Sequence, residues 1–139
     1  MTASVRLERE GAIAFVTLAN AGRLNAMSRA MWRELRAVFE QGLAQDAATR
    51  CVVVRGEGAA FCAGGDISEY PSFRFDEASL REFHENEVWG ALAAMLACEL
   101  PLVAQIEGAC MGAGLEIASC CDIRLAGASS KFGAPIAKL

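Results

Sequence analysis

The sequence predicts an α/β fold, because strand-like and helix-like segments alternate along it. Short runs rich in valine, isoleucine and leucine stand between longer stretches whose apolar residues recur at helical spacing. The resulting order is strand, strand, helix, strand, helix, strand, helix, strand. Such alternation is typical of a mainly parallel sheet covered by helices. No linker or low-complexity segment interrupts it, so we expect one domain over residues 1–139.

Composition excludes several classes of protein. The chain has 139 residues, of which 54% are hydrophobic and 22% charged, and this balance is typical of a globular domain rather than a disordered segment. The net charge is −4 and no dense basic stripe follows the sequence, so we expect no nucleic-acid partner. The N-terminal residues lack the apolar core of a signal peptide, and no apolar run reaches membrane-spanning length. We therefore expect a cytoplasmic protein without a membrane partner.

The cysteines do not predict disulfides or a metal site. Six cysteines are present, but no Cys-x-x-Cys pair occurs and His84 is the only histidine. Structural zinc sites usually need four such ligands at close spacing. We expect reduced thiols in the core and no metal.

The first third of the chain predicts a β-hairpin and a helix. Residues 5–10 alternate between apolar and polar, and residues 12–18 follow across Gly11 as a more buried strand. Residues 20–25 have the composition of a loop. Ser28 is a natural N-cap, and apolar residues at helical spacing continue from it to about Asp46.

The middle of the chain predicts a strand, a glycine-rich loop and two helices. Residues 51–54 form a continuous β-branched run, which is typical of a strand covered on both faces. The loop 56–65 leads to Asp66, which can cap a short helix over residues 67–70. A long amphipathic helix is predicted from about residue 76 to 98. Its expected inward residues are Leu80, Phe83, Ala91, Leu92, Met95 and Cys98.

The last third predicts a strand, a glycine-rich bend, a helix and further strands. Pro101 ends the long helix, and residues 102–106 form the next strand. Small residues around Gly112 then lead into a helix that carries Glu116 in its first turn. Residues 123–126 and the segment that starts at Lys131 predict two more short strands.

Two glycine-rich loops are the best candidates for chemistry. Residues 61–66 and 110–114 each follow a buried strand and precede a helix, so their backbone N–H groups are accessible to a ligand. If the strands are parallel neighbours, both loops open at the same end of the sheet. One amide from each would form a two-donor oxyanion hole beside the Glu116 carboxylate. Either loop alone is weak evidence, because glycine often satisfies only the geometry of a bend, and a first-turn glutamate can simply favour the helix dipole.

The motifs resemble the N-terminal part of the crotonase (enoyl-CoA hydratase/isomerase) superfamily. The matching segments are residues 24–27, 60–67, 108–118, 121–122 and 132–135, and their order and spacing span nearly the whole chain. The resemblance implies a crotonase-like spiral of β-β-α turns, truncated before the C-terminal helices of the family. It also implies an acyl-CoA thioester as substrate, with coenzyme A as part of the substrate and no separate cofactor.

The resemblance also assigns residues. Glu116 matches the first of two catalytic glutamates, and the amides of Ala63 and Ala113 match the oxyanion-hole positions. Predicted contacts with coenzyme A or the substrate come from Arg23, Leu24, Asn25, Ala26, Cys62, Gly64, Gly65, Asp66, Ile67 and Gly112. Glu69 and Tyr70 are weaker candidates for the border of the acyl pocket, and an isolated helical His84 is expected to be a surface or satisfied core residue rather than a catalytic one. The family forms trimers or dimers of trimers, so a homo-oligomer is expected for the full-length protein.

One residue departs from the hydratase pattern. Ile136 stands directly after Pro135, where hydratases of this superfamily place the second glutamate. A hydratase usually positions one water between two carboxylates, so the substitution predicts weaker hydration or a different reaction. Family chains are also longer, so we expect residues 1–139 to be part of a longer protein, a truncated product or the ordered part of a processed chain. The alternative function is an acyl-CoA-binding or assembly fragment without useful catalysis.

Overall fold

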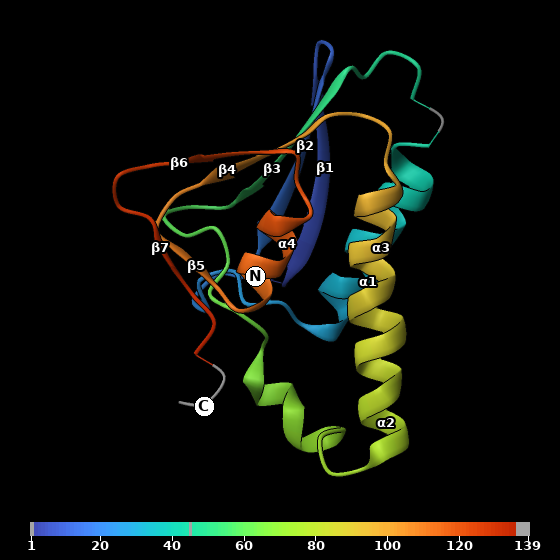
Figure 1. Ribbon diagram of the computed structural model, residues 1–139, viewed down its shortest axis with the longest axis vertical. Coiled ribbons are helices and arrows are strands. Elements are labelled where there is room, and N and C mark those ends of the chain that lie inside the picture. Colours follow the sequence, from blue (N-terminus) through green and yellow to red (C-terminus); the bar gives the residue numbers. More distant parts are fainter. Residues whose placement is uncertain (1, 45, 136–139) are drawn as a thin grey trace.

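A five-stranded sheet forms the centre of the computed structural model, which describes residues 2–44 and 46–135. Its strands are β1 (Ser4–Glu10), β2 (Ile13–Ala19), β3 (Cys51–Gly56), β4 (Leu102–Ile106) and β6 (Ile123–Ala126), adjacent in that order (Figure 1). β1 and β2 form the predicted antiparallel hairpin, and β2, β3, β4 and β6 are parallel neighbours. The two-residue turn of the hairpin includes Gly11 at φ +62°, a conformation that glycine adopts without steric cost.

A second, two-stranded sheet pairs β5 (Ala109–Met111) in parallel with β7 (Lys131–Gly133). β7 was predicted from the sequence and β5 was not. β5 has only three residues and lies between glycines, so it carries no periodic signal. Its pairing shows the spiral: the segment β4, β5 and α4 (Ala113–Ser119) forms one turn, and β6 and β7 add to the same two sheets in the next turn. The predicted fold class is confirmed.

Helix α1 (Arg29–Ala37) begins at the predicted cap and continues as a wide π turn, η1 (Val38–Gly42). The Ser28 hydroxyl accepts a hydrogen bond from the Met31 N–H at 3.1 Å. The predicted end near Asp46 is a few residues too late. Asp46 instead accepts hydrogen bonds from the amides of Ala48 and Thr49 at 3.2 Å, so its carboxylate stabilises the turn that leads to β3.

The region between β3 and β4 contains a short helix and a long one. The short 3₁₀ helix η2 (Ile67–Ser72) is capped by Asp66, whose carboxylate accepts from the Ser68 N–H at 3.1 Å. The predicted long helix is observed as α2 (Glu77–Glu82), the π turn η3 (Phe83–Val88) and α3 (Trp89–Ala97) in direct succession. No helix in the described ranges has both the length and the apolar character needed to cross a membrane.

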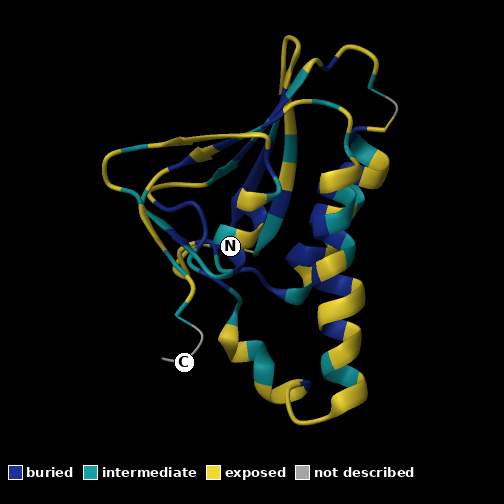
Figure 2. Cartoon of the chain, in the orientation of Figure 1, coloured by how far each residue is buried: buried dark blue, intermediate teal, exposed yellow. Residues whose placement is uncertain are grey.

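The hydrophobic core lies between the large sheet and the helices α1, α3 and α4 (Figure 1). Figure 2 shows the buried residues concentrated there, whereas β6 is exposed along its whole length. The expectation that β3 is covered on both faces is only half right. Val52 and Val54 are fully buried on one face, but Cys51 and Val53 on the other face are half-buried.

Candidate functional site

The two glycine-rich loops meet at one end of the sheet. β3 and β4 are parallel neighbours, so the segments after them leave the sheet side by side. The Cys62 N–H donates to the Ala109 carbonyl at 2.9 Å, and the Met111 N–H donates to the Cys62 carbonyl at 3.0 Å. The predicted convergence of the loops is therefore observed, and backbone hydrogen bonds hold it.

Glycines make this close approach possible. A Cβ atom on Gly114 would overlap the backbone carbonyl oxygen of Cys62, and one on Gly108 would overlap that of Ala59. Gly112 is the N-cap of α4 with φ +51°, and a Cβ on it would lie 3.7 Å from the Cα of Gly64. These glycines let the start of α4 and the preceding strand pack directly against the backbone of the first loop.

Hydrogen bonding shows which amide of the first loop is available. The Ala63 N–H donates to the Leu24 carbonyl at 3.0 Å, so it is not directed at a ligand. The Met27 N–H donates to the Gly64 carbonyl, and the Asp66 N–H donates to the Met27 carbonyl. These two hydrogen bonds form a parallel β-bridge between Met27 and Gly65. In such a bridge the N–H and the carbonyl of Gly65 itself point away from Met27, and the N–H has no acceptor among the described residues. We therefore move the predicted donor from Ala63 to Gly65.

The second available amide belongs to Ala113. Its N–H lies in the first turn of α4, where amides have no partner within the helix. No other described group accepts from it, whereas the neighbouring Gly112 N–H donates to the Gly133 carbonyl at 2.8 Å. Gly65 and Ala113 thus each contribute one unpartnered amide, on either side of the contact between the two loops.

Glu116 carries the carboxylate of the site. Its N–H donates to the Gly112 carbonyl at 3.0 Å, which places its side chain in the first turn of α4. The residue as a whole is exposed, yet the protein around the carboxyl group raises its pKa by desolvation. The charge of His84 opposes this shift. His84 itself is exposed on its helix, which agrees with the expectation of a surface or core histidine.

Cys62 has no surface left for a ligand in this structure. Its side chain is fully buried, and its backbone N–H and carbonyl are both used between the loops. Burial raises the pKa of its thiol to about 12, so the thiol is neutral. All six cysteines are free. Cys62 contributes packing rather than the predicted substrate contact.

Asn25 is also buried, and its side chain forms hydrogen bonds with backbone groups of the protein. It donates to the carbonyls of Glu57 and Ala60 at 2.9 Å and accepts from the Asn20 N–H at 3.0 Å. Leu24 and Asn25 both have positive φ, and this brings the chain back across the loop after β3. A contact between this segment and coenzyme A would therefore use its exposed neighbours or its backbone.

The exposed neighbours lie together beside the first loop. Arg23 forms an ion pair with Asp66, with Nη1 and Oδ1 3.1 Å apart, and also contacts the Ser68 hydroxyl. Half of the Arg23 side chain is exposed, and Leu24 and Ile67 are both 59% exposed. Ala26 is half-buried. The structure thus brings together segments that lie about 40 residues apart in sequence.

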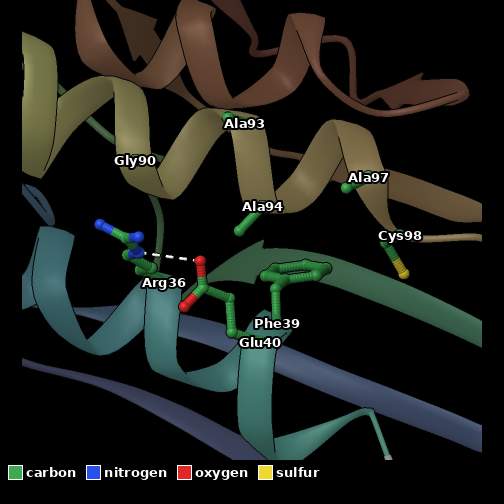
Figure 3. A pocket seen from close by; sticks show the side chains of 8 residues that line it. All are labelled: Arg36, Phe39, Glu40, Gly90, Ala93, Ala94, Ala97 and Cys98. Atoms are coloured by element: carbon green, nitrogen blue, oxygen red, sulfur yellow. Dashed lines mark hydrogen bonds and ion pairs between the residues drawn. The ribbon is translucent and has the colours of Figure 1, made fainter.

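A separate groove of about 320 Å³ lies between α1, η1 and α3. Figure 3 shows Arg36 and Glu40 at one side of the groove, opposite the alanines of α3, with Cys98 at the end of that helix. The Arg36 Nε–H donates a hydrogen bond to Glu40 Oε1 at 2.8 Å. None of its lining residues belongs to the two glycine-rich loops. Within the described ranges, no cluster of three or more metal-ligating side chains accompanies either location.

Fold and site together define a class: an α/β spiral in which two unpartnered amides adjoin one carboxylate. The chain belongs to the enoyl-CoA hydratase/isomerase family, whose sequence profile matches residues 8–139. This confirms the crotonase resemblance.

Relatives and solved structures agree with this assignment. The chain is 35% identical over 127 residues to a probable enoyl-CoA hydratase, EchA14, of Mycobacterium tuberculosis. The alignment covers 91% of this chain and 48% of that protein. It is 34% identical over 133 residues to the short-chain-enoyl-CoA hydratase of Clostridium acetobutylicum. That alignment covers 95% of this chain and 49% of the relative. The crystal structure of an enoyl-CoA hydratase/carnithine racemase from Magnetospirillum magneticum matches with a TM-score of 0.92 at 43% identity, over 96% of this chain and 50% of that one. The chain therefore spans about half the length of its relatives.

Proposed function

We propose that the protein containing this chain acts on an acyl-CoA thioester through an enolate held by the amides of Gly65 and Ala113. Glu116 would be the acid/base. Family membership and relatives named as enoyl-CoA hydratases support the substrate class. The observation that carries the proposal is the pair of unpartnered amides on two loops joined beside Glu116.

The amides fit the charge that develops in this reaction. A thioester enolate concentrates negative charge on one oxygen, and fixed N–H donors stabilise that charge more than they stabilise the neutral carbonyl. Removing one such donor typically lowers the rate by about 10²–10³. Because the donors are backbone groups, alanine at position 113 serves as well as glycine.

Glu116 fits the proton transfers. In isomerisation its carboxylate would remove a proton from the α carbon, leave the electron pair on the thioester enolate, and return the proton at the γ carbon. In hydration it would take a proton from water as the oxygen adds to the β carbon, and then deliver it to the α carbon. Desolvation raises the pKa of Glu116, which makes the carboxylate a stronger base.

The exposed segment around Arg23 and Asp66 is the proposed contact for coenzyme A. An arginine guanidinium suits a phosphate, and here the Asp66 carboxylate orients it. We propose no cofactor beyond the coenzyme A of the substrate. A cytoplasmic homo-oligomer, a trimer or a dimer of trimers, remains our proposal for the full-length protein.

A second candidate function is acyl-CoA binding without catalysis. Ile136, which stands in place of the second glutamate, favours it. Ile136 lies outside the described residues.

The test compares Glu116→Gln with the parent and with the exposed control Glu99→Gln. Hydration of crotonyl-CoA and isomerisation of a 3-enoyl-CoA should fall about 10²–10⁴-fold in Glu116→Gln and stay unchanged in the control. Calorimetry should show that all three proteins bind butyryl-CoA. Binding without turnover in the parent would favour the second function, and equal turnover in Glu116→Gln would remove the proposed role of Glu116.

A further inference from the structure

Tyr70 places a hydroxyl group against the first loop of the site. It lies in η2, the helix that directly follows this loop. A Cβ atom on Gly65 would overlap the Tyr70 hydroxyl oxygen. The hydroxyl therefore packs directly on the residue whose N–H is unpartnered, in space that a side chain at position 65 would otherwise fill.

Two buried phenylalanines hold the Tyr70 ring. Phe73 contacts it edge-on with ring centroids 5.5 Å apart, and Phe83 does so at 6.1 Å. Phe73 is 3% exposed and Phe83 is 4% exposed, and the centroids of their rings lie 4.4 Å apart. Such edge-to-face packing restricts the ring, so the hydroxyl has a defined position.

The hydroxyl has no hydrogen-bond partner among the described residues, although the side chain is half-buried. Burial is the main reason that the pKa of Tyr70 is raised, and the negative charge of Glu116 is the second. Tyr70 therefore stays protonated at neutral pH. Glu116 lies in the first turn of α4, and Gly112 and Gly114 pack the start of that helix against the same loop. Because the side chain is only half-buried, its free hydroxyl is open to a water or a ligand that enters the site.

We propose that the Tyr70 hydroxyl and the Glu116 carboxylate together hold the water that adds to the acyl-CoA substrate. This inference rests on the proposed function. Glu116 accepts one proton of the water as its oxygen bonds to the β carbon, and the alkene electrons move onto the thioester oxygen. Tyr70 makes a hydrogen bond to the same water and is unchanged at the end. The proton on Glu116 then moves to the α carbon, so Tyr70 supplies the second polar group of the hydration site.

The test is Tyr70→Phe, which removes one oxygen atom and keeps the ring. Ser72→Ala is the matched control, because it removes an exposed hydroxyl from the same helix, one that donates to the Glu69 carbonyl. We expect Tyr70→Phe to lower kcat for crotonyl-CoA hydration by about 2- to 10-fold, the effect of one hydrogen bond between neutral groups. Its KM, its affinity for butyryl-CoA and its exchange of the butyryl-CoA α protons in D₂O should stay near those of the parent.

The α-proton exchange separates this inference from the proposed function. Exchange needs Glu116 and the amides but no added water, so loss of hydration with exchange retained supports Tyr70 as the partner that holds the water. Equal hydration in Tyr70→Phe and parent overturns the inference alone, as does an equal fall in hydration and exchange. A parent with neither activity overturns the proposed function and this inference with it.

Discussion

Asn25 joins two loops beside the site through its side chain. Its buried amide spans from the Asn20 N–H to the carbonyls of Glu57 and Ala60, in the loop that leads to Gly65. A buried polar group that loses its hydrogen-bond partner destabilises the folded state, because it has given up its hydrogen bonds to water and gained none in return. Asn25 therefore stabilises the loop rather than contacting a ligand with its side chain.

Asn25→Ala should lower the free energy of unfolding by about 2–3 kcal/mol, because it leaves several buried backbone groups without partners. Urea denaturation measures this difference. Gln41→Ala, which removes an exposed amide on η1, is the control and should change stability by less than about 0.5 kcal/mol. Equal stability of both variants would show that the Asn25 hydrogen bonds contribute little.

Glu116→Gln should change the pH dependence of stability. The pKa of Glu116 is raised in the folded protein above its ordinary value of 4.5. The folded state then binds a proton more tightly than the unfolded state, so the parent loses stability as pH rises from 4.5 through the raised pKa. The glutamine variant lacks this loss.

Unfolding by urea across a pH series measures the effect. The stability of Glu116→Gln relative to the parent should increase over that pH window and level off above it. Parallel curves for the two proteins would indicate that the carboxyl group has an ordinary pKa.

At the scale of elements, local signals in the sequence predict helix starts well. Ser28, Asp66 and Asp76 each cap the helix that follows them, because a cap is a contact between residues two or three positions apart. The β5 strand was missed, since its partner β7 lies about 20 residues away and only that pairing defines it. The wide π turns after Ala37 and Glu82 were also missed, because the apolar pattern continues through them.

Gly114→Ala should separate two elements that the fold holds in contact. Its added Cβ meets the backbone carbonyl of Cys62, which cannot move without displacing the loop. We expect stability to fall by about 1–3 kcal/mol, as for other overpacked sites, and turnover to fall with it.

Gly90→Ala is the control for this prediction. It makes the same change in helix α3, but its Cβ meets only the flexible end of Arg36, at 2.7 Å from Nη1. It should be tolerated or raise stability by up to about 1 kcal/mol through helix propensity. Thermal unfolding of both variants, with activity measured in parallel, tests the comparison, and similar behaviour would contradict it.

At the scale of the whole molecule, the meeting of the two loops could be predicted, but the available amide could not. Parallel strands that end at the same edge bring their following loops together whatever the details. The state of the Ala63 N–H depends on Leu24, which comes from a loop almost 40 residues earlier and has positive φ. That long-range hydrogen bond moves the expected donor from Ala63 to Gly65.

Ligand binding should stabilise the whole molecule, because the candidate site joins the loop around Arg23, the loop after β3 and the start of α4. A ligand that binds only the folded state at 100 times its Kd adds about 2.7 kcal/mol to the free energy of unfolding. Butyryl-CoA should therefore raise Tm in proportion to the logarithm of its concentration, whereas butyrate should have no effect. Arg23→Ala should require about 10-fold more butyryl-CoA for the same shift, as expected for one lost bond to a phosphate. Equal shifts in parent and variant would place the coenzyme A phosphates away from Arg23.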